Sequence, residues 1–147
     1  VNIDTDLELM LPDDYVSSTE ERLSLYQKLA DIQNAIDLSK FENELKDRFG
    51  DLPSEAINLL KSVELKWLAA EIGFDKLVVK NKVFLGYFPA NPQDKFYQSD
   101  KFKKIIAYLT QNPKEATLKE KNNQLMMRKD NVKNVDEVNL VLNRILA

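Results

Sequence analysis

Four charged residues of types that can form ion pairs or bind a cation lie within one short stretch: Glu44, Asp47, Arg48 and Asp51. On a helix, Glu44 and Asp47 project from the same side because they are three residues apart. A calcium or magnesium site needs more oxygen ligands than this spacing brings together. Glu44 and Arg48 can pair with each other at i and i+4, which is worth about 0.2–0.5 kcal/mol. The residues alone favour a solvated helix face containing this pair, and a protein-binding role is the alternative.

The sequence has few residues suited to catalysis. It has no cysteine and no histidine, which removes disulfides, Ser-His and Cys-His catalysis, and the usual zinc ligands. Its three glycines, Gly50, Gly73 and Gly86, form no glycine-rich loop that could hold phosphates. A carboxylate enzyme would require acids with raised pKa values in a cleft. We therefore expect no catalytic residues, no cofactor and no metal in this chain.

The acidic stretch must be positioned by an amphipathic helix. Leu38, Phe41, Leu45 and Phe49 recur at intervals of three and four residues, which predicts one apolar stripe facing a core. Glu44 and Asp47 project away from that stripe. A helix is commonly followed by a left-handed glycine and then by a proline suited to open the next helix, which Gly50-Asp51-Leu52-Pro53 supplies.

The remaining patterns predict a single α+β domain: an N-terminal strand and a three-helix unit, then two β-hairpins alternating with two helices. We expect three parts, namely a strand and turn (1–16), a helical half (17–75) and an α+β half (76–147). The expected elements are a strand at 4–11, helices from about 19 to 36, 38 to 49 and 54 to 72, a hairpin at 77–88, a helix at 99–111, a hairpin at 116–129 and a helix from 134. The expected local features are an inward-facing Leu7, Leu9 and Leu11, a buried Ile36, a core Trp67 and a possible bulge at Gly86. Overlapping capping boxes at Ser17 and Ser18, a cap at Asn134 and a tight turn at Asn122-Asn123 are also expected.

The net charge of −3 hides an asymmetry. Residues 1–75 hold 7 Lys/Arg against 17 Asp/Glu, a balance of −10, whereas residues 76–147 hold 14 against 7, a balance of +7. An acidic surface suits a basic protein partner and repels a phosphate backbone. Nucleic acid is therefore disfavoured for the first half and remains an alternative partner for the second.

The alternative, a nucleic-acid-binding module, depends on the basic residues of the second half. They are Lys101, Lys103, Lys104, Lys119, Lys121, Arg128 and Lys129. Phe102 and Tyr108 are candidates for stacking on bases, but both have the spacing of core residues. No known nucleic-acid module fits the pattern, so we favour a solvated surface over a binding patch.

Features relevant to location are sparse. No apolar run approaches the roughly 20 residues that span a bilayer, and no signal peptide precedes the first strand. We therefore expect a soluble, cytoplasmic protein without membrane contact. The chain starts at Val1 rather than Met and enters patterned sequence directly, which favours a piece of a longer protein.

Several blocks of the sequence resemble the C-terminal (TRCF) domain of bacterial transcription-repair coupling factors. The blocks are Leu11-Pro12-Asp13-Asp14-Tyr15, Arg22-Leu23-Ser24-Leu25-Tyr26, Glu44-Leu45-Lys46-Asp47-Arg48-Phe49-Gly50-Asp51-Leu52-Pro53 and the run to Gly73. The resemblance covers about residues 9–75, and residues 76–147 share mainly the succession of elements. Leu9-Met10-Leu11-Pro12 departs from the family pattern, which more often has Ala-Tyr before an aliphatic-Pro pair.

The resemblance implies a regulatory function. The parent protein would be an ATP-dependent DNA translocase that removes stalled RNA polymerase, with ATP and Mg used by motor domains outside this chain. The C-terminal domain would dock on the parent's N-terminal UvrB-like domain and mask the surface that binds the damage sensor UvrA. The resemblance places Glu44 and Asp47 against basic residues of that domain, with Arg48 orienting Glu44 and Asp51 as a lesser contact.

Overall fold

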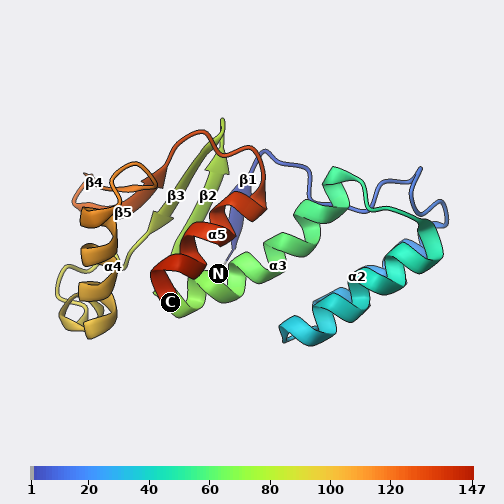
Figure 1. Cartoon of the computed structure of the whole chain (residues 1–147), viewed down its shortest axis with the longest axis horizontal. Helices are drawn as coiled ribbons and strands as arrows, with labels where there is room; N and C mark the ends of the chain where they lie inside the picture. Colours follow the sequence, from blue (N-terminus) through green and yellow to red (C-terminus); the bar gives the residue numbers. More distant parts are fainter. Residues whose placement is uncertain (1) are drawn as a thin grey trace. The chain divides into compact units, whose positions relative to one another are not determined.

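The computed structural model describes residues 2–147 and confirms the α+β fold (Figure 1). The elements are β1 (Ile3–Thr5), α1 (Thr19–Ala30), α2 (Ala35–Phe49), α3 (Ser54–Ile72), β2 (Lys76–Lys80), β3 (Val83–Tyr87), the 3-10 helix η1 (Lys95–Gln98), α4 (Asp100–Gln111), β4 (Thr117–Lys121), β5 (Gln124–Lys129) and α5 (Val135–Leu146). This order of helices and hairpins is the one that the sequence predicts.

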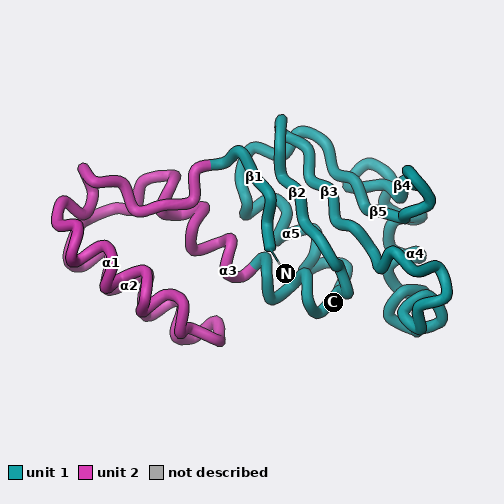
Figure 2. The backbone as a smooth tube through the Cα atoms, turned by 180° about the vertical axis from the view of Figure 1, so that it is seen from behind, with its two compact units in different colours: residues 1–7, 65–147 teal, residues 8–64 magenta. Residues whose placement is uncertain are grey.

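The chain forms two compact units, drawn in magenta and teal in Figure 2. The helical unit comprises residues 8–64, and the sheet unit comprises residues 2–7 with 65–147. Helix α3 contributes its first half to the helical unit and its second half to the sheet unit. The three-part division at residues 16 and 75 stays a prediction.

Helices α1 and α2 of the helical unit begin at side-chain caps. Ser18 accepts a hydrogen bond from the backbone N–H of Glu21, and Asn34 accepts one from that of Asp37. Each cap satisfies a donor that has no partner within the helix. Within α2, Leu38, Phe41 and Leu45 are buried, as the apolar stripe predicts. The stripe therefore fixes which side of α2 faces the core.

The turn before α1 is fastened to the helices by side chains. The Tyr15 hydroxyl donates to the backbone oxygens of Gly50 at 2.8 Å and Leu45 at 3.2 Å. The ring of Tyr15 lies 5.7 Å from that of Phe49, measured between centroids. Gly50 has φ of 89°, a left-handed conformation that suits glycine and ends α2. Tyr15 thereby holds the C-terminal end of α2, where the candidate acidic residues lie.

The sheet unit contains five strands in the order β1-β2-β3-β5-β4. Strand β1 pairs parallel with β2, and the other pairs are antiparallel. Both hairpins turn through two residues with positive φ, Asn81-Lys82 and Asn122-Asn123. This geometry is that of tight hairpin turns, in which asparagine is tolerated, and the Asn122-Asn123 turn is confirmed.

One face of the sheet is buried. Leu77, Val79, Phe84 and Met127 alternate toward this face and are almost fully buried. Helix α5 and the second half of α3 lie along it (Figures 1 and 2). A cluster of aromatic rings extends the core, with Phe88 in contact with Phe74, Phe96 and Phe102. Within residues 2–147, no helix of the sheet unit lies along the opposite face (Figure 2), although Met126 on that face is buried.

Four local expectations were wrong or only partly right. The first strand is shorter than predicted, and of its leucines only Leu11 is buried, while Leu7 and Leu9 are half-exposed. Ile36 is 70% exposed because it lies in the first turn of α2, not at the end of α1. Trp67 is half-buried. The pairing of β2 with β3 continues through Gly86 without a bulge. Gly86 is needed there because a Cβ atom at this position would lie 2.5 Å from the ring of Phe74.

Candidate interaction site on the second helix

The four predicted contact residues occupy the C-terminal part of α2 and the turn after it. Glu44, Asp47 and Arg48 are on α2, and Asp51 follows Gly50. Their burial differs, because the Glu44 side chain is 32% exposed whereas Asp47, Arg48 and Asp51 are exposed. These positions are consistent with contact to another molecule, but two of the four are already engaged within the chain.

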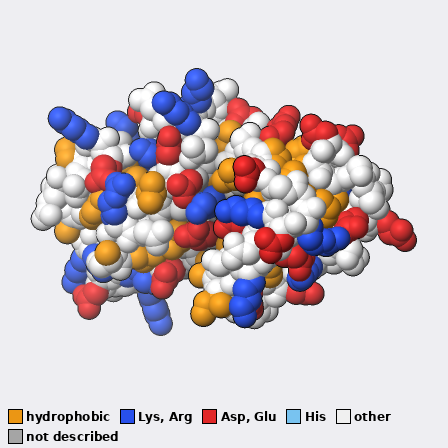
Figure 3. Space-filling view, turned by 45° about the vertical axis from the view of Figure 1, so that its right-hand side comes forward, with side chains coloured by type: hydrophobic (Ala, Val, Ile, Leu, Met, Phe, Trp, Pro, Cys, Tyr) orange, Lys and Arg blue, Asp and Glu red, His pale blue; other side chains and the backbone are white. Residues whose placement is uncertain are grey.

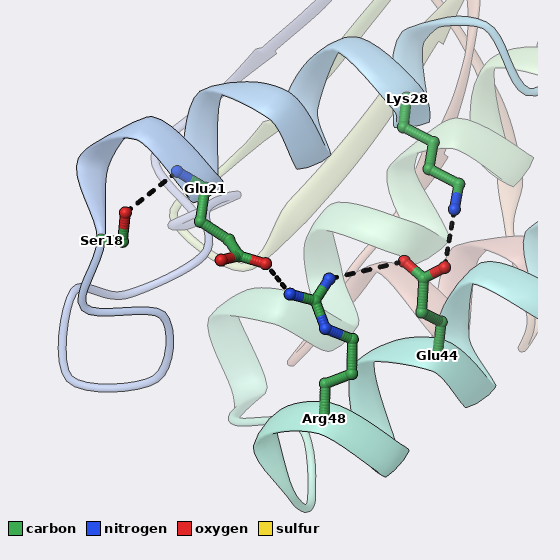
Figure 4. Close-up of polar contacts among 5 residues, drawn as sticks. All are labelled: Ser18, Glu21, Lys28, Glu44 and Arg48. Carbon is green, nitrogen blue, oxygen red and sulfur yellow. Dashed lines mark hydrogen bonds and ion pairs between the residues drawn. The ribbon is translucent and has the colours of Figure 1, made fainter.

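Glu44 and Arg48 belong to a network of ion pairs that joins α1 to α2 (Figure 4). Glu44 lies between two cations, with Oε1 at 2.6 Å from Lys28 Nζ and Oε2 at 4.0 Å from an Arg48 nitrogen. Arg48 also pairs with Glu21. The predicted Glu44–Arg48 pair is therefore present, but the closer partner of each residue is on α1.

The network follows from the antiparallel arrangement of the two helices. A connection of four residues joins α1 to α2, which requires the second helix to run back along the first. Glu21 in the first turn of α1 then faces Arg48 in the last turn of α2. Each of these charges also suits the dipole of its own helix, with the acid at the N-terminus and the base at the C-terminus. The network therefore stabilises the helix pair.

Sequence reasoning missed Glu21 and Lys28. Glu21 was visible as the third residue after Ser18 in a capping box, and Lys28 lies in the last turn of α1. Combining these positions with the short connection to α2 would have predicted both cross-helix pairs. The spacing within α2 alone predicts only the Glu44–Arg48 pair.

Asp47 and Asp51 are the acids of the stretch that stay unpaired. Within residues 2–147, neither forms a salt bridge with a lysine or arginine. Asp47 is in the last turn of α2, near the negative end of the helix dipole, where a carboxylate is unfavourable. The pKa of Tyr15 is raised, first by burial of its hydroxyl and then by the charge of Asp51. Two uncompensated negative charges therefore lie at one end of α2.

A shallow hollow of about 450 Å³ adjoins the network. It is lined by Ser18, Glu20, Glu21, Ser24, Leu25, Lys28, Glu44 and Arg48. Charged groups of both signs surround it, so a partner that enters it can exchange ion pairs with those already present. The hollow therefore suits a partner that binds through polar and charged groups.

The predicted basic residues do not form one patch with the predicted aromatic residues. Lys101, Lys103 and Lys104 are on α4, Lys119 and Lys121 on β4, and Arg128 and Lys129 on β5. The Phe102 ring packs against Phe88, Phe96 and Tyr97. The Tyr108 hydroxyl donates to Glu115 at 2.6 Å. Both stacking candidates thus take part in contacts inside the fold.

The charges are distributed unequally between the two units. The helical unit holds 6 Lys/Arg against 13 Asp/Glu, a balance of −7, and the sheet unit with Val1 holds 15 against 11, a balance of +4. Figure 3 shows that acidic and basic side chains are both frequent on the face that it draws. Each unit therefore suits a partner of the opposite charge.

The described residues contain neither a metal-binding cluster nor a membrane-spanning helix. Over residues 2–147, no cluster of three or more Asp, Glu, His or Cys side chains is arranged to hold a metal ion. None of the helices within those residues has the length and apolar character required to cross a membrane.

Comparison with known proteins places the chain in a family. A family model described as the TRCF domain matches residues 5–99. The chain belongs to the TRCF domain family. It is 30% identical over 142 residues to the transcription-repair-coupling factor of Rickettsia prowazekii (strain Madrid E), covering 96% of this chain and 12% of that protein. It is 28% identical to the transcription-repair-coupling factor of Buchnera aphidicola subsp. Baizongia pistaciae (strain Bp), covering 98% of this chain and 20% of that protein.

A solved structure shares the fold. The crystal structure of the C-terminal domain of a transcription-repair coupling factor superposes with a TM-score of 0.79 at 19% identity, covering 99% of this chain and 91% of that one. This likeness confirms the predicted fold, and the family-model match confirms the predicted family. The TRCF domain is not a catalytic domain. The chain spans only 12% and 20% of the length of the two relatives named above.

Proposed function

We propose that this TRCF domain is a non-catalytic regulatory domain that docks on another part of its own parent protein, a transcription-repair coupling factor. In the proposed closed state, it covers the parent's N-terminal UvrB-like domain and masks the surface that binds UvrA. The parent's work on DNA and RNA polymerase, with ATP and Mg, belongs to domains outside this chain. Membership of the TRCF family supports the parent assignment.

The observation that carries the docking proposal is the pair of uncompensated carboxylates at the end of α2. Asp47 and Asp51 are exposed and make no salt bridge within residues 2–147. Asp47 also opposes the dipole of its own helix, so a basic partner would relieve an unfavourable interaction. We assign the direct contacts to Asp47 and Asp51. Glu44 and Arg48, which are paired with α1, hold this end of α2 in place and border the contact.

A contact of this kind suits a latch that opens. Exposed ion pairs are typically worth about 0.2–1 kcal/mol each, so a few of them give a reversible closure. The two binding events are linked: if docking lowers the affinity of the masked surface for UvrA by some factor, UvrA binding lowers the affinity of docking by the same factor. UvrA binding and domain docking are therefore expected to oppose each other quantitatively.

The test is a binding titration of this domain against the N-terminal portion of its parent. The double variant Asp47→Lys/Asp51→Lys is expected to weaken docking at least tenfold, because two attractive charges become repulsive. The same double variant in the full-length parent is expected to bind UvrA more tightly by a similar factor.

The matched control is Glu71→Lys/Glu120→Lys, which makes the same charge change at two exposed acids of the sheet unit. It is expected to leave docking and UvrA affinity unchanged. Equal weakening by the two double variants would show a general effect of net charge. Unchanged docking by Asp47→Lys/Asp51→Lys, with the domain still folded by circular dichroism, would remove the assignment of this surface.

A further inference from the structure

The uncovered face of the sheet carries an ordered row of side chains. In the strand register, Lys119 of β4 is opposite Met126 of β5, Met126 is opposite Tyr87 of β3, and Tyr87 is opposite Lys76 of β2. Paired residues on neighbouring strands point to the same face of a sheet. Of the two central side chains, Met126 is buried and the Tyr87 ring is half-buried, so the row presents one aromatic ring between two exposed lysines. We call this surface the open face.

The open face carries positive charge that the chain does not neutralise. Lys121 shares the face with Lys119 because it is two residues further along β4. Across residues 2–147, no carboxylate forms a salt bridge with Lys76, Lys119 or Lys121. Arg128, on the same face, is paired with Asp130 at 2.9 Å. The three unpaired lysines favour an anionic ligand.

The spacing of these groups suits a nucleic-acid strand. Strands lie about 4.8 Å apart, so Lys76 and Lys119 are separated by roughly 14 Å across the sheet, and Lys119 and Lys121 by about 7 Å along β4. Several phosphates in sequence could contact such a set of lysines. Between them the Tyr87 ring is only half-buried, and Lys76 Nζ lies 5.6 Å from its centroid. The long side chain of Lys76 can move from the ring to a phosphate.

We propose that the open face binds single-stranded nucleic acid, with a base stacked on the half-buried Tyr87 ring and the backbone held by Lys76, Lys119 and Lys121. Aromatic side chains within a basic surface are the combination by which sheets bind unpaired strands. A duplex hides its base faces, so a partly exposed aromatic ring favours a single strand over a duplex. The proposal concerns the sheet unit and is independent of the docking surface on α2.

The experiment measures fluorescence anisotropy of a labelled thymidine oligonucleotide of about 12 nucleotides with the 147-residue chain, at salt concentrations between about 50 and 200 mM. The variant Lys76→Gln/Lys119→Gln/Lys121→Gln is expected to reduce the salt slope by about 2, since each single-strand phosphate contact contributes about 0.7. Tyr87→Leu is expected to weaken binding by about tenfold, and Tyr87→Phe to preserve it.

Two controls make the result specific. Lys101→Gln/Lys103→Gln/Lys114→Gln removes the same charge from exposed lysines outside the open face and is expected to change binding little. Circular dichroism checks that each variant folds. Absence of binding at low salt, equal loss in both triple variants, equally tight binding of a duplex, or equal competition by polyglutamate would each overturn the proposal.

Discussion

The helical unit and the sheet unit are stabilised by different kinds of contact. In the helical unit, polar side chains connect the segments: Lys28 pairs with Glu44, Arg48 with Glu21, and Tyr15 donates to the backbone at the end of α2. The sheet unit relies on backbone ladders and on a cluster of aromatic rings around Phe88. The two surfaces proposed for binding are therefore held in place by different kinds of contact, polar side chains in one unit and a sheet with an aromatic core in the other.

The two units also leave opposite charges uncompensated. The helical unit leaves carboxylates at Asp47 and Asp51, and the sheet unit leaves lysines on the open face. In each case the unpaired charges are exposed and supported by an ordered element, which is an arrangement that costs little stability and suits the proposed binding functions. Whether the units also unfold independently is a question that substitutions in each core can answer.

The largest expected effect comes from removing a buried ring. Phe41→Ala in the helical unit and Phe84→Ala in the sheet unit are each expected to cost about 3–5 kcal/mol, because both rings are almost fully buried. Hydrogen exchange measured by mass spectrometry would locate the loss. Phe41→Ala is expected to expose amides of α1 and α2 while the strand amides stay protected. Equal deprotection of both units would show that they unfold together.

A smaller effect is expected at Tyr15. Tyr15→Phe removes the hydroxyl that donates to Gly50 and Leu45, which is expected to cost about 1–2 kcal/mol because a net hydrogen bond is worth about 1 kcal/mol. Urea denaturation would measure this. The control is Tyr87→Phe in the sheet unit, since the Tyr87 hydroxyl has no hydrogen bond within residues 2–147, and it is expected to stay within about 0.5 kcal/mol of wild type. Similar losses in both variants would contradict the role of Tyr15 as a fastening residue.

The sequence predicted the fold where a local signal decides the structure. The caps at Ser18 and Asn134, the stripe on α2, Gly50 and the Asn122-Asn123 turn are each specified by residues close together in the chain. The Gly86 prediction failed because its cause is distant in the sequence, namely the Phe74 ring packed against it. The prediction of a buried Ile36 was wrong because α2 begins directly after its cap residue Asn34, and this cap signal was overlooked.

The candidate site was predictable in part. The spacing of Glu44 and Arg48 predicted their pair, but the nearer partners, Lys28 and Glu21, depend on the packing of α1 against α2. The open face was missed because its row joins four strands whose order is not the order of the chain. Strand alternation alone could have put Lys119 and Lys121 on one face, but not beside Tyr87. Contacts across the strands of the sheet were therefore beyond reach of the local patterns, whereas the two ion pairs between α1 and α2 could have been inferred from the short connection.

The smallest expected effect is on the pH dependence of folding stability, and it comes from one carboxylate of the sheet unit, Glu115. A hydrogen bond from the Tyr108 hydroxyl, and then the Arg144 guanidinium, hold the pKa of Glu115 below its ordinary value of 4.5, against the opposing effect of burial. Because the folded-state pKa is the lower one, the unfolded chain binds the proton more readily. The stabilisation is therefore present above pH 4.5 and is lost as the pH falls through the folded-state pKa.

Urea denaturation at a series of pH values would test this. Glu115→Gln keeps a side chain that can accept a hydrogen bond but removes the titrating group, so its stability is expected to fall less steeply than that of wild type below pH 4.5. The matched control is Glu44→Gln, which removes a paired carboxylate from the helical unit and leaves Glu115 to titrate as before. Parallel curves for wild type and Glu115→Gln would show that this contact adds nothing to the pH dependence, and a flattened curve in Glu44→Gln instead would move the acid-sensitive contact to the helical unit.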